Sequence, residues 1–143
     1  MCVPTVLVAC VHNAGRSQAA AALLRYYAGD RLVVLSGGSQ PTDEVNPVVA
    51  TVLAERGLQL TDPPRRWDVA MVRSADVVVT MGCGDTCPFY PGKRYEDWDV
   101  VDPAGRMPDQ VRPIVDDIDR RVRQLLVELL PDLSLPPSPG AGG

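Results

Sequence analysis

The sequence predicts an α/β fold, a three-layer sandwich in which helices flank a four-stranded parallel sheet. Short apolar runs typical of buried strands alternate along the chain with longer segments that have the periodicity of amphipathic helices. Strands that are joined through a helix are expected to be parallel, with right-handed crossovers. At 143 residues, the chain has the length of one domain with a single core.

The first half of the chain predicts two strands, each followed by a helix. Gly29 stands where a helix C-cap favours positive φ, and Asn46-Pro47 provides an N-cap followed by proline at the first helical position. Gly57 is expected to end the second helix. The predicted ranges are strands over residues 3–9 and 32–35 and helices over residues 17–28 and 46–57.

The second half predicts two more strands, a short helix and a long amphipathic helix. The third strand is mostly β-branched, which favours a central position in the sheet. Pro113 is expected in the first turn of the long helix, because deeper inside it would break the helix, and Pro131 is expected to end it. The predicted ranges are a helix over residues 68–73, strands over 76–81 and 94–97, and a helix over 111–129.

These elements predict a single domain over residues 1–131. Residues 132–143 are mainly Pro, Ser, Gly and Ala, which predicts a disordered, Pro/Gly-rich tail.

Charge and composition exclude several classes of function. The net charge of −4 and the isoelectric point of about 4.9 argue against a nucleic-acid surface and an electrostatic membrane anchor. No apolar run approaches the roughly 20 residues that span a bilayer, and no signal peptide is evident. The chain is large enough to form a core, so its four cysteines do not indicate a disulfide scaffold, and we expect a reducing, cytoplasmic setting. We also expect a monomer.

The loop that joins the first strand to the first helix carries the strongest chemical signal. Backbone N–H groups curled between Cys10 and Arg16 would form an anion nest, and the helix N-terminus adds the positive end of its dipole. The Arg16 guanidinium is a planar fork that matches tetrahedral oxyanions. The same field stabilises a thiolate at Cys10, which is the nucleophilic form of the side chain. The expected oxyanion-binding residues are Val11, His12, Asn13, Ala14, Gly15 and Arg16.

Three side chains of this region each have a functional and a structural interpretation. Ser17 can donate its hydroxyl to the thiolate or serve as a plain helix N-cap. Asn13 can tune Cys10 or simply occupy a turn. His12, the only histidine, can raise the positive potential near Cys10 or point outward, and its spacing favours neither a base nor a metal ligand.

Asp102 is the candidate general acid. It precedes Pro103, which favours extended backbone, and an acid above the anion site would protonate the leaving oxygen as Cys10 attacks. The alternative is an aspartate that begins a loop turn.

Cys83 and Cys87 follow the third predicted strand, at the same edge of the sheet as the Cys10 loop. They are either resolving thiols for a modified Cys10 or inert core thiols. A zinc site is disfavoured because Cys-x3-Cys lacks a second pair, and His12 and Cys2 would complete it poorly. No metal is therefore expected.

The chain resembles the low-molecular-weight protein tyrosine phosphatases and the arsenate reductases that share their fold, over nearly its whole length to about Leu130. The resemblance rests on the Cys-x5-Arg-Ser loop between a strand and a helix near the start of the chain. It also includes Val11-His12-Asn13-Ala14-Gly15-Arg16-Ser17-Gln18, Asn46-Pro47, Val79-Thr80-Met81-Gly82-Cys83-Gly84-Asp85-Thr86-Cys87-Pro88, Pro91-Gly92-Lys93-Arg94-Tyr95-Glu96-Asp97-Trp98 and Asp102-Pro103-Ala104-Gly105.

Three features favour the reductases within this resemblance. The catalytic loop ends in Gln18, where the phosphatases commonly have proline. Ala104-Gly105 follows Asp102-Pro103, where the phosphatases place aromatic residues against a phosphotyrosine ring. Cys83 and Cys87 supply thiols that a hydrolase does not need. As a set, the motifs are similar to those of arsenate reductases that couple to mycothiol.

The resemblance implies that Cys10 attacks arsenate, that Arg16 and the loop amides bind the oxyanion, that Ser17 assists the nucleophile and that Asp102 is the general acid. It implies no bound cofactor and a thiol reductant, mycothiol with a mycoredoxin. Thioredoxin, acting through Cys83 and Cys87, is one alternative, although thioredoxin-coupled relatives space these cysteines further apart. A phosphatase that hydrolyses phosphate monoesters is the other. The potassium of some relatives is not expected, because Ala21 replaces their glutamate.

Overall fold

Four parallel strands form one sheet in the order β2-β1-β3-β4 in the computed structural model, which describes residues 3–60, 62–82 and 91–139. The strands are β1 (Thr5–Cys10), β2 (Val33–Gly38), β3 (Val77–Met81) and β4 (Arg94–Asp97). The register pairs Cys10 with Gly38 of β2 and with Met81 of β3. Because parallel strands end at the same edge of a sheet, Cys10 lies near the middle of the carboxyl edge.

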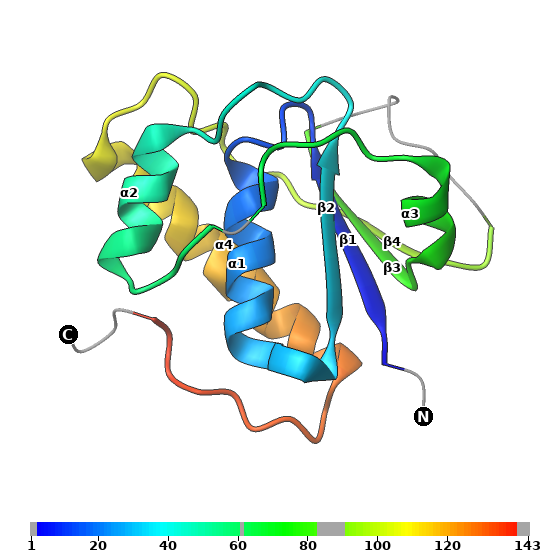
Figure 1. Cartoon of the computed structure of the whole chain (residues 1–143). Helices are drawn as coiled ribbons and strands as arrows, with labels where there is room; N and C mark the ends of the chain where they lie inside the picture. The colour runs from blue at the N-terminus through cyan, green and yellow to red at the C-terminus, as the bar shows by residue number, and fades with distance from the viewer. Residues whose placement is uncertain (1–2, 61, 83–90, 140–143) are drawn as a thin grey trace.

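Helices cover both faces of the sheet, so the predicted three-layer α/β sandwich is confirmed. Helices α1, α2 and α4 lie on one side, and the short helix α3 lies on the other (Figure 1). Their bounds are α1 (Arg16–Ala28), α2 (Pro47–Glu55), α3 (Val69–Ser74) and α4 (Pro108–Leu129), with a 3-10 turn η1 (Gly29–Arg31) after α1.

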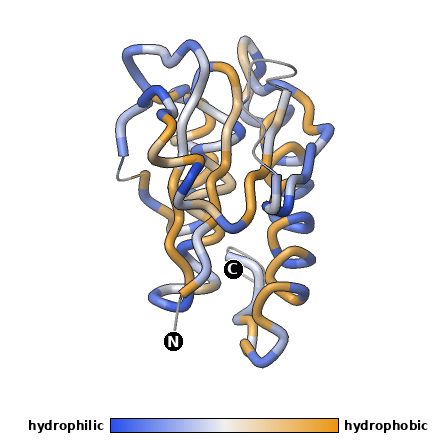
Figure 2. The backbone as a smooth tube through the Cα atoms, turned by 90° about the vertical axis from the view of Figure 1, so that its right-hand side faces the viewer, coloured by the Kyte–Doolittle hydropathy of each residue, from blue (hydrophilic) through white to orange (hydrophobic). Residues whose placement is uncertain are grey.

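The alternation of side chains along the strands creates one apolar core on each face of the sheet. Val6 and Val8 point to the large core that α1 and α4 cover, whereas Leu7 and Val78 point to the smaller core beneath α3. Figure 2 shows hydrophobic segments gathered in the interior and hydrophilic turns toward the ends. The sheet is therefore buried on both faces, as is usual for a parallel sheet.

Two element boundaries differ from the prediction by three residues, and the others by two or fewer. Strand β2 continues through Gly37-Gly38, which pair with Ala9 and Cys10 of β1, and Gly38 also forms an isolated bridge to Arg66. Helix α4 begins at Pro108, which takes the first helical position, while the Gln110 side chain accepts the N–H of Met107. Pro113 therefore lies in the second turn instead of the first, where its missing N–H leaves one carbonyl unpaired near an exposed helix start.

Residues 132–139 of the expected tail have contacts that the sequence did not indicate. Leu133 and Leu135 pack against the large core, and Ser138 accepts hydrogen bonds from Tyr27 and Arg123. The predicted division of the chain at residue 131 stays a prediction. In the part of the chain that the structure describes, no helix is long and apolar enough to cross a membrane.

Candidate active site

The backbone of the loop between β1 and α1 is held from outside through its carbonyl groups. Gln40, Thr42 and Asn46 donate their backbone N–H groups to the carbonyls of Val11, His12 and Ala14, at 2.8, 3.2 and 2.8 Å. The carbonyl of Asn13 accepts from Nε2 of Gln18 at 3.0 Å. Four consecutive loop carbonyls therefore face donors that surround the loop.

This anchoring determines where the loop N–H groups point. In a trans peptide the C=O of one residue and the N–H of the next are antiparallel, and the described chain contains no cis peptide. The N–H groups of residues 12–15 therefore point away from the donors outside. A cavity of about 40 Å³ is lined by Cys10, His12, Ala14, Gly15 and Arg16 of this loop together with Asp102, whereas Val11 and Asn13 are not among its lining residues. The predicted anion nest, which included Val11 and Asn13, stays a prediction.

The Cys10 thiol has a hydroxyl partner whose proton direction can be worked out. Cys10 is 3% exposed, and its Sγ lies 3.0 Å from Oγ of Ser17. Nδ2 of Asn13 donates to that same Oγ at 2.7 Å. A thiolate has no proton to give, so when Cys10 is ionised the Ser17 hydroxyl is the donor of this bond. Ser17 is inside α1 and the N-cap is Gly15, so the alternative of a plain N-cap is not the arrangement observed, and its role in assisting Cys10 stays a prediction.

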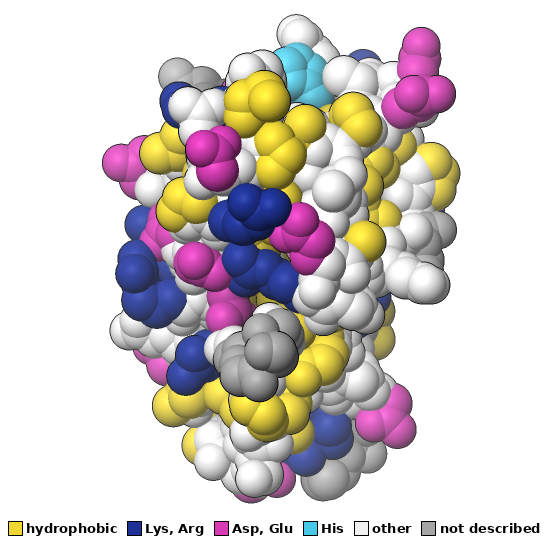
Figure 3. All heavy atoms as spheres, turned by 90° about the vertical axis from the view of Figure 1, so that its left-hand side faces the viewer, with side chains coloured by type: hydrophobic (Ala, Val, Ile, Leu, Met, Phe, Trp, Pro, Cys, Tyr) yellow, Lys and Arg dark blue, Asp and Glu magenta, His cyan; other side chains and the backbone are white. Residues whose placement is uncertain are grey.

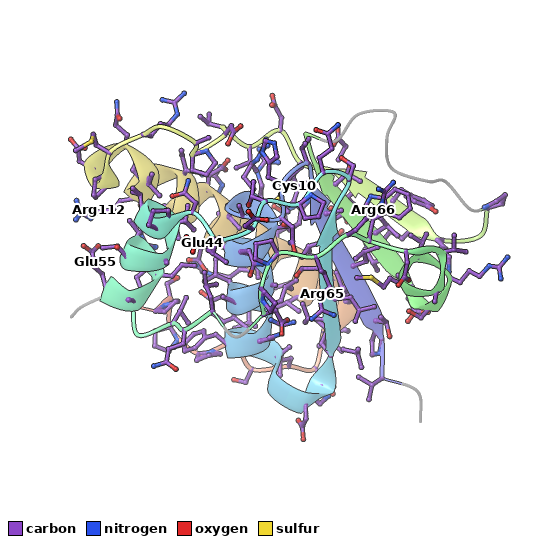
Figure 4. All side chains as sticks on the ribbon, turned by 45° about the horizontal axis from the view of Figure 1, so that its top comes forward. Cys10, Glu44, Glu55, Arg65, Arg66 and Arg112 are labelled. Carbon is purple, nitrogen blue, oxygen red and sulfur yellow. The ribbon has the colours of Figure 1, made fainter. Side chains whose placement is uncertain are left out.

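Two contributors to this network were not found from the sequence. The backbone N–H of Arg65 donates to Oδ1 of Asn13 at 3.0 Å, which fixes the amide so that Nδ2 faces Ser17. The buried Gln18 side chain donates to the Asn13 carbonyl and holds this residue in a left-handed conformation with φ of 49°. Figure 4 shows Arg65 and Arg66 on the segment that runs past the Cys10 end of the sheet.

Arg16 is held at the cavity by groups from two other segments. Its Nη1 donates to the Val100 carbonyl at 3.3 Å, and its Nη2 lies 3.7 Å from Oδ2 of Asp102. Gly82 has φ of +83°, and a Cβ there would lie 2.6 Å from Nη1 of Arg16. A glycine after β3 is therefore required both by the backbone and by the guanidinium that crosses it.

The Asp102-Pro103 loop closes over the catalytic loop. Pro103 packs against Gly15, where a Cβ would lie 2.8 Å from its ring. Oδ1 of Asp102 accepts the N–H of Ala104 at 3.0 Å, while Oδ2 faces Arg16 and the side chain is 54% exposed. Asp102 is therefore both a turn residue and an acid at the cavity, so the two interpretations of it are compatible.

The remaining candidates are placed as follows. His12 is exposed and lines the mouth of the cavity, while its carbonyl accepts from Thr42. Cys83 and Cys87 lie outside the described residues. Among residues 3–60, 62–82 and 91–139, no group of three or more His, Cys, Asp or Glu side chains is placed to hold a metal ion.

Comparison with known proteins gives a consistent assignment. Residues 5–134 match the family described as low molecular weight phosphotyrosine protein phosphatase. The chain is 34% identical over 126 residues to arsenate reductase 1 of Bacillus cereus, covering 84% of this chain and 92% of that protein.

Solved structures that are similar to the chain include two arsenate reductases. A thioredoxin-dependent arsenate reductase of Corynebacterium glutamicum matches with a TM-score of 0.81 and 46% identity, over 91% of this chain and 63% of that one. The present chain therefore spans less than two thirds of that protein. An arsenate reductase of Archaeoglobus fulgidus matches with a TM-score of 0.72 and 30% identity, over 85% of this chain and 98% of that one.

Proposed function

The chain belongs to the low molecular weight phosphotyrosine protein phosphatase family, and we propose that it is an arsenate reductase of that family. The observation that carries this proposal is the buried Cys10 thiol, which lines a cavity together with Arg16 and lies 3.0 Å from the Ser17 hydroxyl. The similarity to arsenate reductases over most of their length supports the choice of oxyanion.

In the first step, the Cys10 thiolate attacks the arsenic of an arsenate held by the loop N–H groups and Arg16. A sulfur–arsenic bond forms, and one arsenic–oxygen bond breaks. The leaving oxygen takes a proton from Asp102, which lies at the cavity, and departs as water. Ser17 stabilises the thiolate before attack, and the nest stabilises the negative charge on the remaining oxygens.

In the second step, the thiolate of a reductant attacks Sγ of Cys10. A sulfur–sulfur bond forms, the sulfur–arsenic bond breaks, and its electron pair stays on arsenic. Two sulfur atoms are oxidised to a disulfide while arsenic goes from the +5 to the +3 state, so arsenite is released. We propose mycothiol with a mycoredoxin as the reductant, because only three residues separate Cys83 from Cys87. Thioredoxin is the alternative, because the similar Corynebacterium glutamicum arsenate reductase is thioredoxin-dependent.

This chemistry needs a compartment in which Cys10 returns to its reduced form, and we propose the cytoplasm. No bound cofactor is required, and we propose that the enzyme acts as a monomer on a free arsenate or phosphate-like oxyanion.

Hydrolysis of phosphate monoesters is the second candidate function, favoured by the family to which the chain belongs. It would use the same nucleophile and the same nest. The residues that follow Asp102-Pro103 argue against an aromatic ester, because Ala104 and Gly105 offer no ring to stack on.

The deciding experiment measures arsenite formation and phosphotyrosine-peptide hydrolysis by the same purified protein. We expect arsenite with mycothiol plus mycoredoxin, and none from Cys10→Ser. Activity with thioredoxin and its reductase alone, lost in Cys83→Ser or Cys87→Ser, would overturn the mycothiol assignment. Efficient peptide hydrolysis without arsenate-dependent thiol oxidation would overturn the reductase assignment.

A further inference from the structure

A second and much larger cavity opens directly beside the catalytic one. It has a volume of about 490 Å³, and it shares His12, Ala14, Asn46 and Ala104 with the catalytic cavity. Its remaining lining comes from the loop between β2 and α2, residues 42–47. Three other cavities of the molecule share no lining residue with the catalytic one. Among these cavities, the groove is therefore the one that adjoins the Cys10 site.

The groove is acidic, whereas the catalytic cavity is lined by one acid, Asp102, and by the Arg16 guanidinium. Asp43 and Glu44 line it, together with the apolar Val45, Pro47 and Ala104, and neither Arg nor Lys is among its lining residues. In the described part of the chain no ion pair engages either carboxylate. Figure 4 shows Glu44 on the same side of the molecule as Cys10. The catalytic cavity instead contains the Arg16 guanidinium.

The two acids are held in place by the bonds that order the catalytic loop. Thr42 and Asn46 flank them and donate to the carbonyls of His12 and Ala14. The Thr42 hydroxyl also donates to the Glu44 carbonyl at 2.8 Å, which closes the turn. The acidic wall therefore keeps a fixed relation to the oxyanion nest.

We propose that this groove binds the carrier portion of a small thiol co-substrate, and that Asp43 and Glu44 favour a thiol that offers hydroxyl or amide donors and carries no carboxylate. The inference rests on the proposed function, which requires a second thiol at Cys10. The catalytic cavity of about 40 Å³ has room for roughly three water-sized groups, so an arsenate on Cys10 occupies it. Carboxylates accept hydrogen bonds from hydroxyl and amide donors, and they repel a thiol that carries its own carboxylate.

The test uses a matched pair of thiols, N-acetylcysteinamide and N-acetylcysteine, which differ by one neutral amide in place of a carboxylate. The measurement is kcat/KM for arsenite formation with each thiol. Each value is divided by the rate constant of thiol–disulfide exchange between the same thiol and a small disulfide in solution. This division removes the difference in intrinsic thiol reactivity. We expect the protein to prefer the neutral thiol by about fivefold at low salt, from two partly screened charges, and less at high salt.

Three variants report on the groove. Asp43→Asn with Glu44→Gln is expected to abolish the preference, and Asp43→Asn with Glu44→Lys, which leaves one positive charge, is expected to reverse it. Asp30→Asn is the matched control, because Asp30 is an exposed acid on η1, outside both cavities, and it should leave the preference unchanged. An unchanged preference in the first two variants overturns the proposal. Turnover with thioredoxin but with neither small thiol overturns it as well.

A binding measurement separates failure of the groove from failure of the proposed reaction. Saturation-transfer NMR with the S-methyl ether of each thiol requires no arsenate chemistry. We expect a stronger signal from the neutral ether, and its loss in Val45→Trp, which fills the groove. Absence of arsenite with every thiol, including dithiothreitol, refutes the reductase assignment alone, whereas equal NMR signals from both ethers refute the groove.

Discussion

Removing the Ser17 hydroxyl should slow the reaction of Cys10 with electrophiles at neutral pH. The hydroxyl lies 3.0 Å from Sγ, and it is the donor to an ionised Cys10, because a thiolate can only accept. Hydrogen bonds to charged groups contribute about 1.5–3 kcal/mol, so Ser17→Ala should lower the thiolate population about 10- to 150-fold. The remaining thiolate is less stabilised and therefore more nucleophilic. With a Brønsted coefficient of about 0.4–0.5, this gain in nucleophilicity offsets roughly half of the loss in thiolate population on a logarithmic scale. The net expectation is about 3- to 10-fold slower alkylation.

The assay is the rate of iodoacetamide labelling of the Cys10 peptide, followed by mass spectrometry so that the other three cysteines do not contribute. Arsenate should still protect Cys10 in the variant, because the nest is built from backbone N–H groups that the substitution leaves in place. Ser74→Ala is the matched control: this serine is exposed on α3 and bonds only to its own helix.

The variant must also be checked by urea unfolding. Asn13 is fully buried, and loss of its acceptor should cost about 1–3 kcal/mol of stability. Alkylation of a folded Ser17→Ala protein at the rate of the parent would refute the reasoning, because the Ser17 proton would then not be directed at the sulfur.

Four further predictions concern the residues around this network and one buried tyrosine. Arg16→Lys loses the planar fork, so arsenate should protect Cys10 at least about tenfold less well. Gly82→Ala places a Cβ against the Arg16 guanidinium at positive φ, and urea unfolding should show a loss of about 1–2 kcal/mol. Gln18→Leu frees the Asn13 backbone, and kcat for arsenate should fall more than its KM rises. Burial, and after it the hydrogen bond to Asp119, raises the pKa of Tyr27 from 10.0 to about 12. Between these two pH values the folded protein therefore keeps a phenol proton that the unfolded chain has released. That contribution to stability is complete below pH 10 and is lost as the pH rises through about 12, and unfolding of Tyr27→Phe should lack this part of the alkaline decline.

The parts of the fold that sequence predicts are those with a local cause. The Asn46-Pro47 helix start is confirmed, with Oδ1 of Asn46 accepting the N–H groups of Val48 and Val49. Three of the four strands occur where the apolar runs stand, whereas β4 is polar, and all four strands are parallel as predicted. The chemistry of the Cys10 loop was also predicted from the sequence, because its residues are contiguous and their side-chain types indicate a nucleophile beside an oxyanion site.

The parts that sequence does not predict depend on contacts between distant segments. The bond from Arg65 to Asn13 spans 52 positions and uses a backbone N–H, which no side-chain pattern reveals. Gly82 has the appearance of an ordinary turn glycine until Arg16 is seen to cross it. Gln18 separates reductase-like from phosphatase-like sequences, but its bond to the Asn13 carbonyl becomes visible only when the loop is folded.

The order of the catalytic loop depends on where α2 lies, because the donors from residues 40–46 lead directly into that helix. Two kinds of contact fix α2 against α4. Figure 3 shows arginine and acidic side chains mingled on this face, where Arg56 pairs with Asp116 and Arg112 with Glu55, a pair also labelled in Figure 4.

The apolar contacts of α2 outweigh these ion pairs. The Arg112–Glu55 side chains are 46% and 42% exposed, and such pairs contribute about 0.2–1 kcal/mol each. Burial of Val49, Val52 and Leu53, all within 1% of full burial, contributes about 1.5–3 kcal/mol for each side chain. A large-to-small change at Leu53 should therefore disorder the anion nest from a distance, whereas neutralising Glu55 should leave arsenate binding intact. The loop that performs the chemistry is positioned by the core behind it.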